Sequence, residues 1–261
     1  MTIGSKELQQ LVDFAVTIAR EAGDLALRHY RSPYAVEKKP DGSEVTVADR
    51  DAEAHLRSRI SKQFPDDAIF GEEQEDYKGA SGRRWIIDPI DGTFSFVRRV
   101  PMFGVLVALA DESNVLLGVV NLPATQEIVS AARGLGCFWN GARARVSATE
   151  SMTEALLLST DFGTCEAYGF GRSAERLQRQ AKACRTWGDC YGHILVATGR
   201  ADVMLDPIMN VWDCAPLLPI LEEAGGTFTD WKGSPTIDGG NAISTNRKLF
   251  AEVMKVIREN S

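Results

Sequence analysis

Three apolar segments with the periodicity of β-strands follow one another in the middle of the chain, and this run constrains the fold most. They are Phe103–Ala110, Val115–Asn121 and Glu127–Ala132, separated by turn residues. Before them, apolar residues recur at three- and four-residue steps over Lys6–Arg31 and Thr46–Phe64, which predicts two long amphipathic helices. Strands mixed with helices of this length predict a layered α/β or α+β fold and argue against a helix bundle or a barrel.

Shorter elements are expected in the rest of the chain. Further strands are predicted at Ala68–Glu73, Arg84–Ile90, Ala155–Ser159, Val203–Leu205, Thr227–Thr229 and Ala242–Ser244, and further helices at Ser173–Ala183, Tyr191–Thr198, Asp213–Ala224 and Arg247–Arg258. The stretch Lys38–Glu44 is typical of an exposed loop, and Gly134, Gly136, Asn140 and Gly141 indicate a β-turn region. We find no repeat or linker, so residues 1–261 are expected to form one unit. A weak subdivision is expected near residue 150, between a metal-binding α+β half (1–150) and an α/β half that contains the substrate-specificity segment (151–261).

The composition narrows the class of partner. The chain carries 29 basic and 36 acidic side chains, a net charge of −7, which argues against general nucleic-acid or anionic-membrane binding. No stretch approaches the roughly 18–20 apolar residues that cross a bilayer, and the first residues lack the apolar core of a signal peptide. The five cysteines are odd in number and form no C-x-x-C pair, which fits reduced thiols. We therefore expect a cytoplasmic protein without a membrane partner.

Three acidic clusters each follow an apolar run, at the end of a predicted strand or the start of a predicted helix. They are Glu72-Glu73, the segment from Asp88 to Thr93, and Asp213. Each cluster alone is typical of a turn or a solvated face. Together they indicate a metal site, because a carboxylate at the end of a buried strand is costly unless it is paired or bound to a cation. Several carboxylate oxygens from separate segments suit Mg²⁺.

The segment Asp91-Gly92-Thr93 adds an anion site. If Thr93 begins a helix, the amides of Gly92 and Thr93 point outward and can bind phosphate. Metal-binding carboxylates beside such a site indicate phosphoryl chemistry. The three histidines, His29, His55 and His193, share no spacing, and we find no Ser-His-Asp or Cys-His arrangement.

The motifs resemble those of the inositol monophosphatase family. They are Trp85-Ile-Ile-Asp-Pro-Ile-Asp-Gly-Thr-Phe-Ser-Phe96, with Gly71-Glu-Glu73 upstream and Val211-Trp-Asp-Cys-Ala-Pro216 downstream, in the order of the family and over nearly the whole chain. The resemblance implies an αβαβα layered sandwich and a Mg²⁺-dependent phosphomonoesterase that acts on a small phosphorylated substrate. The family is often dimeric, so a homodimer is expected.

The resemblance also implies the metal ligands. Glu72, Asp88 and the backbone carbonyl of Ile90 would hold the first ion, and Asp88, Asp91 and Asp213 the second. A third, looser ion would lie near Glu72, which gives two to three ions per site.

Catalytic and phosphate-binding residues are implied in the same way. Thr93, hydrogen-bonded to Asp49, would orient the attacking water, and Glu72 is counted with them as a catalytic residue. The amides of Gly92 and Thr93 would hold the phosphate. Lys38 falls where the family has a lysine in a mobile loop near the metals, and its neighbour Lys39 is an equally placed alternative.

The segment around Arg185, which we count as substrate-binding, carries the specificity signal. Inositol phosphatases usually have a small Gly-Ser-Ala-type run where this chain has Gly188-Asp189-Cys190, and the acidic version resembles the histidinol-phosphatase branch. Histidinol phosphate carries an ammonium group, so its pocket gains from a carboxylate near the leaving group, and Asp189 is the first candidate. Asp206 falls where inositol-specific members of the family place an acid that contacts the sugar-like ring, and Asn210 would lie close to both. Asp189 has an alternative or additional role as the N-cap of the following helix.

Some positions depart from that branch. Phe94 stands where a lysine is frequent, His193 where another aromatic residue is expected, and Pro216 where a small residue is expected. An inositol phosphate or another small sugar phosphate is therefore the alternative substrate. The alternative of another class is a phosphatase-fold protein that binds RNA or the transcription machinery, against which the acidic charge counts.

Overall fold

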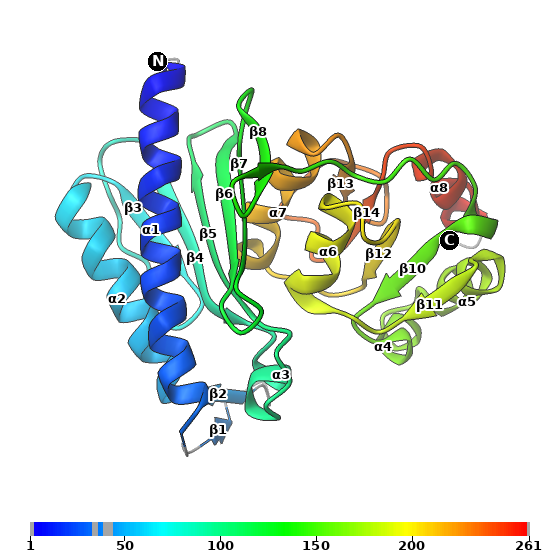
Figure 1. Ribbon diagram of the computed structural model, residues 1–261, viewed down its shortest axis with the longest axis horizontal. Coiled ribbons are helices and arrows are strands. Elements are labelled where there is room, and N and C mark those ends of the chain that lie inside the picture. Colours follow the sequence, from blue (N-terminus) through cyan, green and yellow to red (C-terminus); the bar gives the residue numbers. More distant parts are fainter. Residues whose placement is uncertain (1–2, 33–35, 39–43, 260–261) are drawn as a thin grey trace.

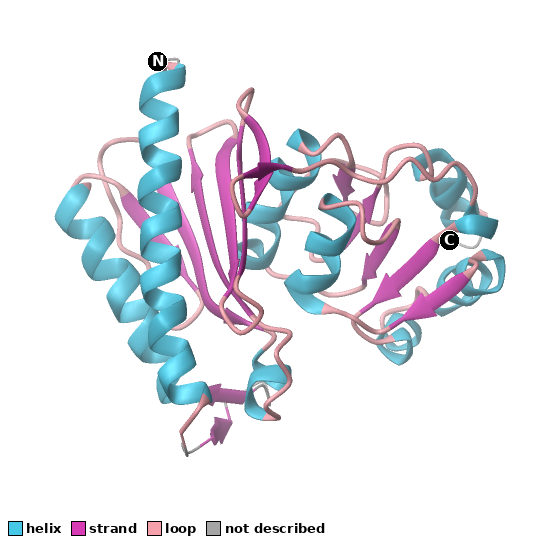
Figure 2. Ribbon diagram, viewed as in Figure 1, coloured by secondary structure: helices cyan, strands magenta, loops and turns pink. Residues whose placement is uncertain are grey.

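The protein is described from a computed structural model that covers residues 3–32, 36–38 and 44–259. Two β-sheets alternate with three layers of helices (Figure 1, Figure 2). The outer helices α1 and α2 lie on one side of the larger sheet, α6 and α7 lie between the two sheets, and α4, α5 and α8 lie beyond the smaller sheet. This arrangement confirms the αβαβα layered sandwich. No helix in the described part of the chain is both long and apolar enough to span a membrane.

The larger sheet has the order β3-β4-β5-β6-β7-β8-β9. Its strands are β3 (Ala68–Gly71), β4 (Arg84–Asp91), β5 (Gly104–Ala110), β6 (Val115–Leu122), β7 (Glu127–Ala132), β8 (Gly136–Trp139) and β9 (Ala142–Arg143). Only β3 and β4 run parallel, and the other neighbours are antiparallel. The expected turn region contains the hairpin β8–β9, in which Asn140 and Gly141 take the positive φ that a tight hairpin turn requires.

Helices α1 (Ser5–Tyr30) and α2 (Val47–Gln63) confirm the two predicted amphipathic helices. Their apolar stripes cover one face of the larger sheet, and Ile18 and Leu56 share a fully buried cluster with Val107 and Val119 of the sheet. The strands β1 (Val36–Lys38) and β2 (Glu44–Thr46) pair antiparallel between these helices in the chain. Residues 39–43 of the expected loop lie outside the described residues.

The smaller sheet has the order β11-β10-β12-β14-β13. Its strands are β10 (Leu156–Ser159), β11 (Ala183–Arg185), β12 (Val203–Asp206), β13 (Thr227–Thr229) and β14 (Ala242–Thr245). Its outer face is covered by η1 (Met152–Glu154), α4 (Phe162–Ala167), α5 (Gly171–Gln180) and α8 (Phe250–Arg258). One prediction was wrong here: the helix expected through Ala183 ends at Gln180, because strand β11 begins at Ala183 and pairs with β10. Helix α4 and strand β11 were not predicted.

The middle layer holds α6 (Asp189–Ala197) and α7 (Val211–Glu223), and α3 (Thr93–Val97) follows β4. Helix α7 lies very close to the larger sheet. A Cβ atom at Gly118 of β6 would come within 2.0 Å of the carbonyl oxygen of Pro216, so only glycine fits there. This close packing holds the first turn of α7, with Asp213, against the larger sheet.

Candidate active site

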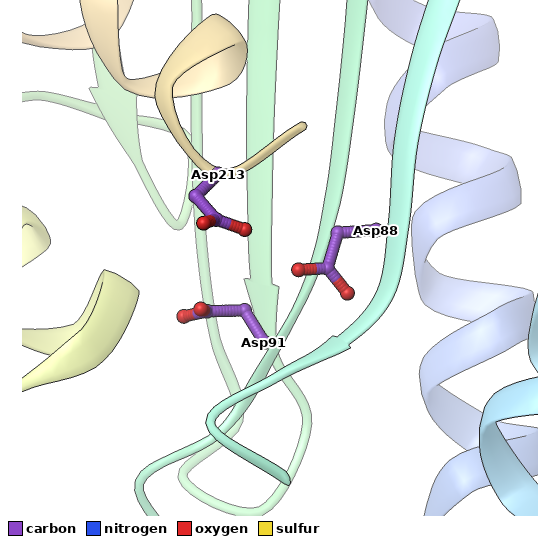
Figure 3. Close-up of side chains that lie close together, drawn as sticks. All are labelled: Asp88, Asp91 and Asp213. Carbon is purple, nitrogen blue, oxygen red and sulfur yellow. The ribbon is translucent and has the colours of Figure 1, made fainter. Parts of the chain in front are cut away.

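Three carboxylates converge where β4 ends and α7 begins. One oxygen from each of Asp88, Asp91 and Asp213 lies within 4.8 Å of the others, and Figure 3 shows the three side chains arranged around one space. Side chains alternate along a regular strand, so residues three apart point to opposite faces. The register of β4 against β5 shifts between Asp88 and Asp91, and this irregularity brings both side chains to the same site.

The pKa values of these acids are raised. Burial raises the pKa of Asp88 well above its ordinary value, and the charges of Glu72, Asp213 and Asp91 raise it further. Burial and the charge of Asp213 raise the pKa of Asp91 to about 7. Burial raises the pKa of Asp213 to about 7 as well, although a hydrogen bond from the backbone of Asn210 opposes the shift. The site thus concentrates negative charge that it does not neutralise.

Backbone amides fix the orientation of all three carboxylates. Asp88 Oδ1 accepts a hydrogen bond from the N–H of Ile90 at 2.9 Å. Asp91 Oδ2 accepts one from the N–H of Cys190 at 2.6 Å, and Asp213 Oδ2 one from the N–H of Asn210 at 2.7 Å. Because each donor is rigid main chain, the carboxylates are held in place before any ligand binds.

Glu72 follows β3, and its loop is clamped by an ion pair of α2. Glu53 is fully buried, pairs with Arg57 at 2.7 Å, and accepts hydrogen bonds from the backbone N–H groups of Glu73 (2.8 Å) and Gln74 (3.0 Å). Arg57 in turn donates to the carbonyl of Gln74 at 3.0 Å. The charge of Glu72 raises the pKa of both Asp88 and Asp213, so Glu72 acts electrostatically on the cluster. The ion pair therefore positions a fourth carboxylate.

The structure contradicts the expected hydrogen bond between Thr93 and Asp49, because both side chains bind other partners. The hydroxyl of Thr93 donates to the carbonyl of Ile90 at 3.0 Å. Asp49 Oδ2 instead accepts from the N–H and the hydroxyl of Thr46, at 2.8 and 2.7 Å. Thr46 is the N-cap of α2, three residues before Asp49, so a local capping box takes this oxygen. In the described chain, Asp49 Oδ1 is buried without a hydrogen-bond partner.

Gly92 connects the cluster to the specificity segment. It has a φ of 80° as the residue before α3. A Cβ atom there would lie 2.8 Å from the carbonyl oxygen of Met102 and 3.1 Å from Asp189 Oδ2. The backbone at the start of α3 therefore lies directly beside the carboxylate of Asp189, and a side chain at this position would be strained by both φ and space.

A cavity of about 200 Å³ opens next to the cluster. It is lined by Asp91, Thr160, Thr164, Asp189, Asp206, Pro207, Ile208, Met209 and Asp213. Thr160, which we did not predict, donates to Asp206 Oδ2 at 2.9 Å and accepts from the N–H of Asp189 at 2.8 Å. It follows the predicted strand that ends at Ser159, so the rule that located the acids at strand ends could have found it. Burial and the charges of Asp91 and Asp206 raise the pKa of Asp189 well above its ordinary value.

Among the other predicted residues, Asn210 and Arg185 do not line this cavity in the described chain. Helix α6 begins at Asp189 itself and has Gly188 as its N-cap, so the alternative capping role for Asp189 is wrong. Asn210 is the N-cap of α7 and is not among the residues that line the cavity in the described chain, so its contribution is to hold Asp213. Arg185 is exposed on β11 and donates to the carbonyl of Cys184 at 2.7 Å. The backbone of Lys38 ends β1, and Lys39 lies outside the described residues.

The donor set fits a hard divalent cation. Carboxylate oxygens and one backbone carbonyl are the ligands that Mg²⁺ prefers. The strongest charges acting on the pKa values of Asp88, Asp91 and Asp213 are those of other carboxylates, so a cation would relieve the repulsion. In the described chain Asp49 Oδ1 is a further buried acceptor without a hydrogen-bond partner, and the charge of Glu72 also raises the pKa of Asp49.

Comparisons with known proteins identify the family of this chain. The profile of the Inositol monophosphatase family matches residues 7–261. A histidinol-phosphatase of Chlorobaculum parvum is 43% identical over 94% of this chain and 96% of that protein. A fructose-1,6-bisphosphatase/inositol-1-monophosphatase of Thermotoga maritima is 36% identical over 95% of this chain and 96% of that protein. The crystal structure of the extragenic suppressor protein suhB from Bartonella henselae has a TM-score of 0.90 at 27% identity, covering 97% of this chain and 100% of that one.

The layered fold and the carboxylate cluster at the end of β4 define the class of metal-assisted phosphate hydrolases. The chain belongs to the inositol monophosphatase family, and it is a phosphomonoesterase.

Proposed function

We propose that this enzyme hydrolyses L-histidinol phosphate to L-histidinol and phosphate with Mg²⁺ as cofactor, in histidine biosynthesis. One observation carries the substrate assignment. The cavity beside the cluster is lined by Asp189 and Asp206 in addition to Asp91 and Asp213. Histidinol carries an ammonium group and an imidazole that can be protonated, so carboxylates here favour it over a neutral polyol. The 43% identity to a histidinol-phosphatase supports the same assignment.

Glu72, Asp88, the carbonyl of Ile90, Asp91 and Asp213 would hold two to three Mg²⁺ ions. When bound, Mg²⁺ lowers the pKa of water and offsets the negative charge of the phosphate ester. The chain contributes a fixed set of oxygen donors, since backbone amides hold three of the carboxylates and the Glu53–Arg57 pair holds the loop of Glu72.

Thr93 and Asp49 prepare the attacking water in this proposal. The hydroxyl proton of Thr93 is used on Ile90, which leaves its lone pairs to accept a hydrogen bond from water. Ala48, next to Asp49, shares an apolar cluster with Ile90 and Phe96, so the start of α2 packs against the segment that carries Thr93. Burial raises the pKa of Asp49, which makes it a stronger base for the proton that the water releases.

In an in-line attack the phosphate lies between this water and the leaving group, so different residues bind the phosphate and the leaving group. The first N–H groups of a helix have no carbonyl one turn earlier, so the amides of Gly92 and Thr93 would hold phosphate oxygens. Asp189 lies beside Gly92 and faces the cavity, where it would contact the ammonium group of histidinol. Asp206 would contact the rest of the cationic leaving group. Lys38 and Arg185 stay predictions as further substrate contacts.

Phosphate release by the purified protein with Mg²⁺ tests this function, with L-histidinol phosphate compared against myo-inositol 1-phosphate. An Asp91→Asn control measures the background. We expect a strong preference for histidinol phosphate. Preference for the inositol ester would retain the phosphatase chemistry and refute the reading of the cavity.

The alternative function, binding of RNA or of the transcription machinery, is tested separately. If neither ester is cleaved above the control, and a gel shift at physiological salt shows RNA binding, the chain acts as an RNA-associated protein instead. The acidic net charge of −7 argues against that outcome. A homodimer and a cytoplasmic location stay predictions.

A further inference from the structure

His193 is a buried histidine next to Asp206, a residue that lines the cavity, and the proposed mechanism does not use it. It lies in α6 and is fully shielded from solvent. Its Nδ1 atom is 2.7 Å from the hydroxyl oxygen of Ser244 on β14. Its Nε2 atom is 3.9 Å from Asp206 Oδ2 on β12, and it has no hydrogen-bond partner within the part of the chain that the structure describes.

The two neighbours of the ring determine which nitrogen carries the proton. If the hydroxyl of Ser244 donates to Nδ1, the neutral ring keeps its proton on Nε2, which then faces the carboxylate of Asp206. If Nδ1 carried the only proton, the lone pair of Nε2 would face a carboxylate across a dry interior, which is repulsive. The first arrangement is therefore favoured. At 3.9 Å the Nε2–H group attracts Asp206 through space without forming a hydrogen bond.

Asp206 is constrained by its other contacts as well. Its Oδ2 atom accepts a hydrogen bond from Thr160 at 2.9 Å, and its backbone carbonyl accepts one from Trp231 Nε1 at 3.0 Å. The residue is buried, yet it lines the cavity. His193 and Thr160 thus act on the same carboxylate oxygen of Asp206, His193 from the buried interior and Thr160 from the wall of the cavity.

We infer that Ser244 and His193 form a positioning pair that orients the carboxylate of Asp206 toward the substrate cavity. The hydroxyl of Ser244 fixes the tautomer of His193, and the protonated Nε2 of His193 holds Asp206 in place. The tautomer of His193 does not depend on which substrate the enzyme uses. The effect of the positioning pair on substrate selectivity does rest on the proposed function, in which Asp206 contacts a cationic leaving group.

Nuclear magnetic resonance on protein with ¹⁵N-labelled histidine tests the tautomer. A long-range ¹⁵N–¹H spectrum distinguishes protonated from unprotonated ring nitrogens, and the signals of His193 are identified by their loss in His193→Gln. We expect a protonated Nε2 and an unprotonated Nδ1, and a mixture of tautomers in Ser244→Ala. A proton on Nδ1 with a bare Nε2 in the wild-type protein would overturn the inference.

Steady-state kinetics test the consequence. The ratio of kcat/KM for L-histidinol phosphate to kcat/KM for p-nitrophenyl phosphate, which has no ammonium group, should fall in His193→Leu. We expect a fall of about tenfold, the lower end of the effect of removing an outer partner of a metal ligand. The fall should come mainly from the KM of histidinol phosphate. His193→Gln, which keeps a side-chain N–H donor, should recover part of the ratio.

Ile194→Val serves as the matched control, because Ile194 is the next residue of α6 and is equally buried. It should leave the ratio unchanged. An equal change for both esters in His193→Leu, or a change in Ile194→Val of the same size, would reduce His193 to a packing role and overturn the inference. If the wild-type protein cleaves p-nitrophenyl phosphate but not histidinol phosphate, the proposed substrate is wrong, and the tautomer alone then decides whether the positioning pair exists.

Discussion

The backbone N–H of Cys190 donates a 2.6 Å hydrogen bond to the carboxylate of Asp91. This contact joins the end of β4 in the larger sheet to the first turn of α6 in the middle layer, across 99 residues of sequence. The same turn begins with Asp189, whose carboxylate lines the cavity. One helix start therefore orients a candidate metal ligand and presents a candidate substrate ligand, so the distance between the two is set by the fold.

Asp91→Asn should abolish nearly all activity while the fold survives, because it removes a charged ligand with little change of shape. The loss in kcat/KM should exceed the roughly 100-fold that removal of an outer partner of a metal ligand costs. Since the variant also removes a repelling buried charge, the metal-free protein should melt at a higher temperature than the wild type at a pH above 7. Asp24→Asn, at an exposed position of α1, is the control and should change neither kcat/KM nor the melting temperature. Wild-type turnover in Asp91→Asn would refute the metal assignment.

Thr93→Ala should lower kcat by roughly 100-fold, a typical contribution of a group that orients proton transfer. KM should change much less, because the phosphate is bound by backbone amides that the substitution leaves in place. Thr93→Ser keeps the hydroxyl that donates to Ile90 and should retain more activity than the alanine variant. An unchanged kcat in Thr93→Ala would show that the hydroxyl only stabilises the start of α3.

Arg57→Met leaves the fully buried carboxylate of Glu53 without its cation. We expect a loss of about 3 kcal/mol in the free energy of unfolding, the usual cost of breaking a buried ion pair on one side. Because Glu53 holds the loop of Glu72, Mg²⁺ affinity should also fall about tenfold. Denaturant unfolding and calorimetric titration measure the two effects. Arg59→Met, which breaks a pair with the partly exposed Glu21, should cost less than about 1 kcal/mol and leave Mg²⁺ affinity intact.

The stability of the metal-free protein should fall as pH rises from about 4 to about 7. Asp91 and Asp213 keep their protons in the folded state up to a pKa of about 7, whereas the unfolded chain releases them near 3.8. The folded state therefore binds more protons than the unfolded state across this range, and the free energy of unfolding decreases with pH. Melting temperatures with a chelator should show this decrease, and added Mg²⁺ should remove it. If the melting temperature in the chelator rises with pH instead, the raised pKa values of Asp91 and Asp213 in the metal-free protein would be contradicted.

Periodicity predicted the long helices and a layered mixture of helices and strands, and strand-end chemistry predicted the acids at strand ends, because both are local properties. The order of the layers was implied by the resemblance to the inositol monophosphatase family. It could not show why Asp88 and Asp91 face the same site, since that depends on a register shift against β5. The buried ion pair of Glu53 and Arg57 has the i, i+4 spacing of an ordinary surface pair, and only the fold distinguishes the two. The sequence could not reveal the partners of His193 in α6, because Ser244 and Asp206 approach it from strands β14 and β12, at no regular spacing in the chain. The organisation of residues 1–261 as one unit stays a prediction.

Titration of Mg²⁺ into protein freed of metal by a chelator tests the central claim most directly, with binding heat and phosphate release from L-histidinol phosphate measured on the same samples. We predict no phosphate release before the titration and recovery of activity in parallel with binding. Asp213→Asn should give less binding heat and no recovery of activity, because it removes a ligand of the second ion and leaves those of the first in place. Full activity in the chelator, or recovery without binding at the site of Asp88, Asp91 and Asp213, would contradict the account.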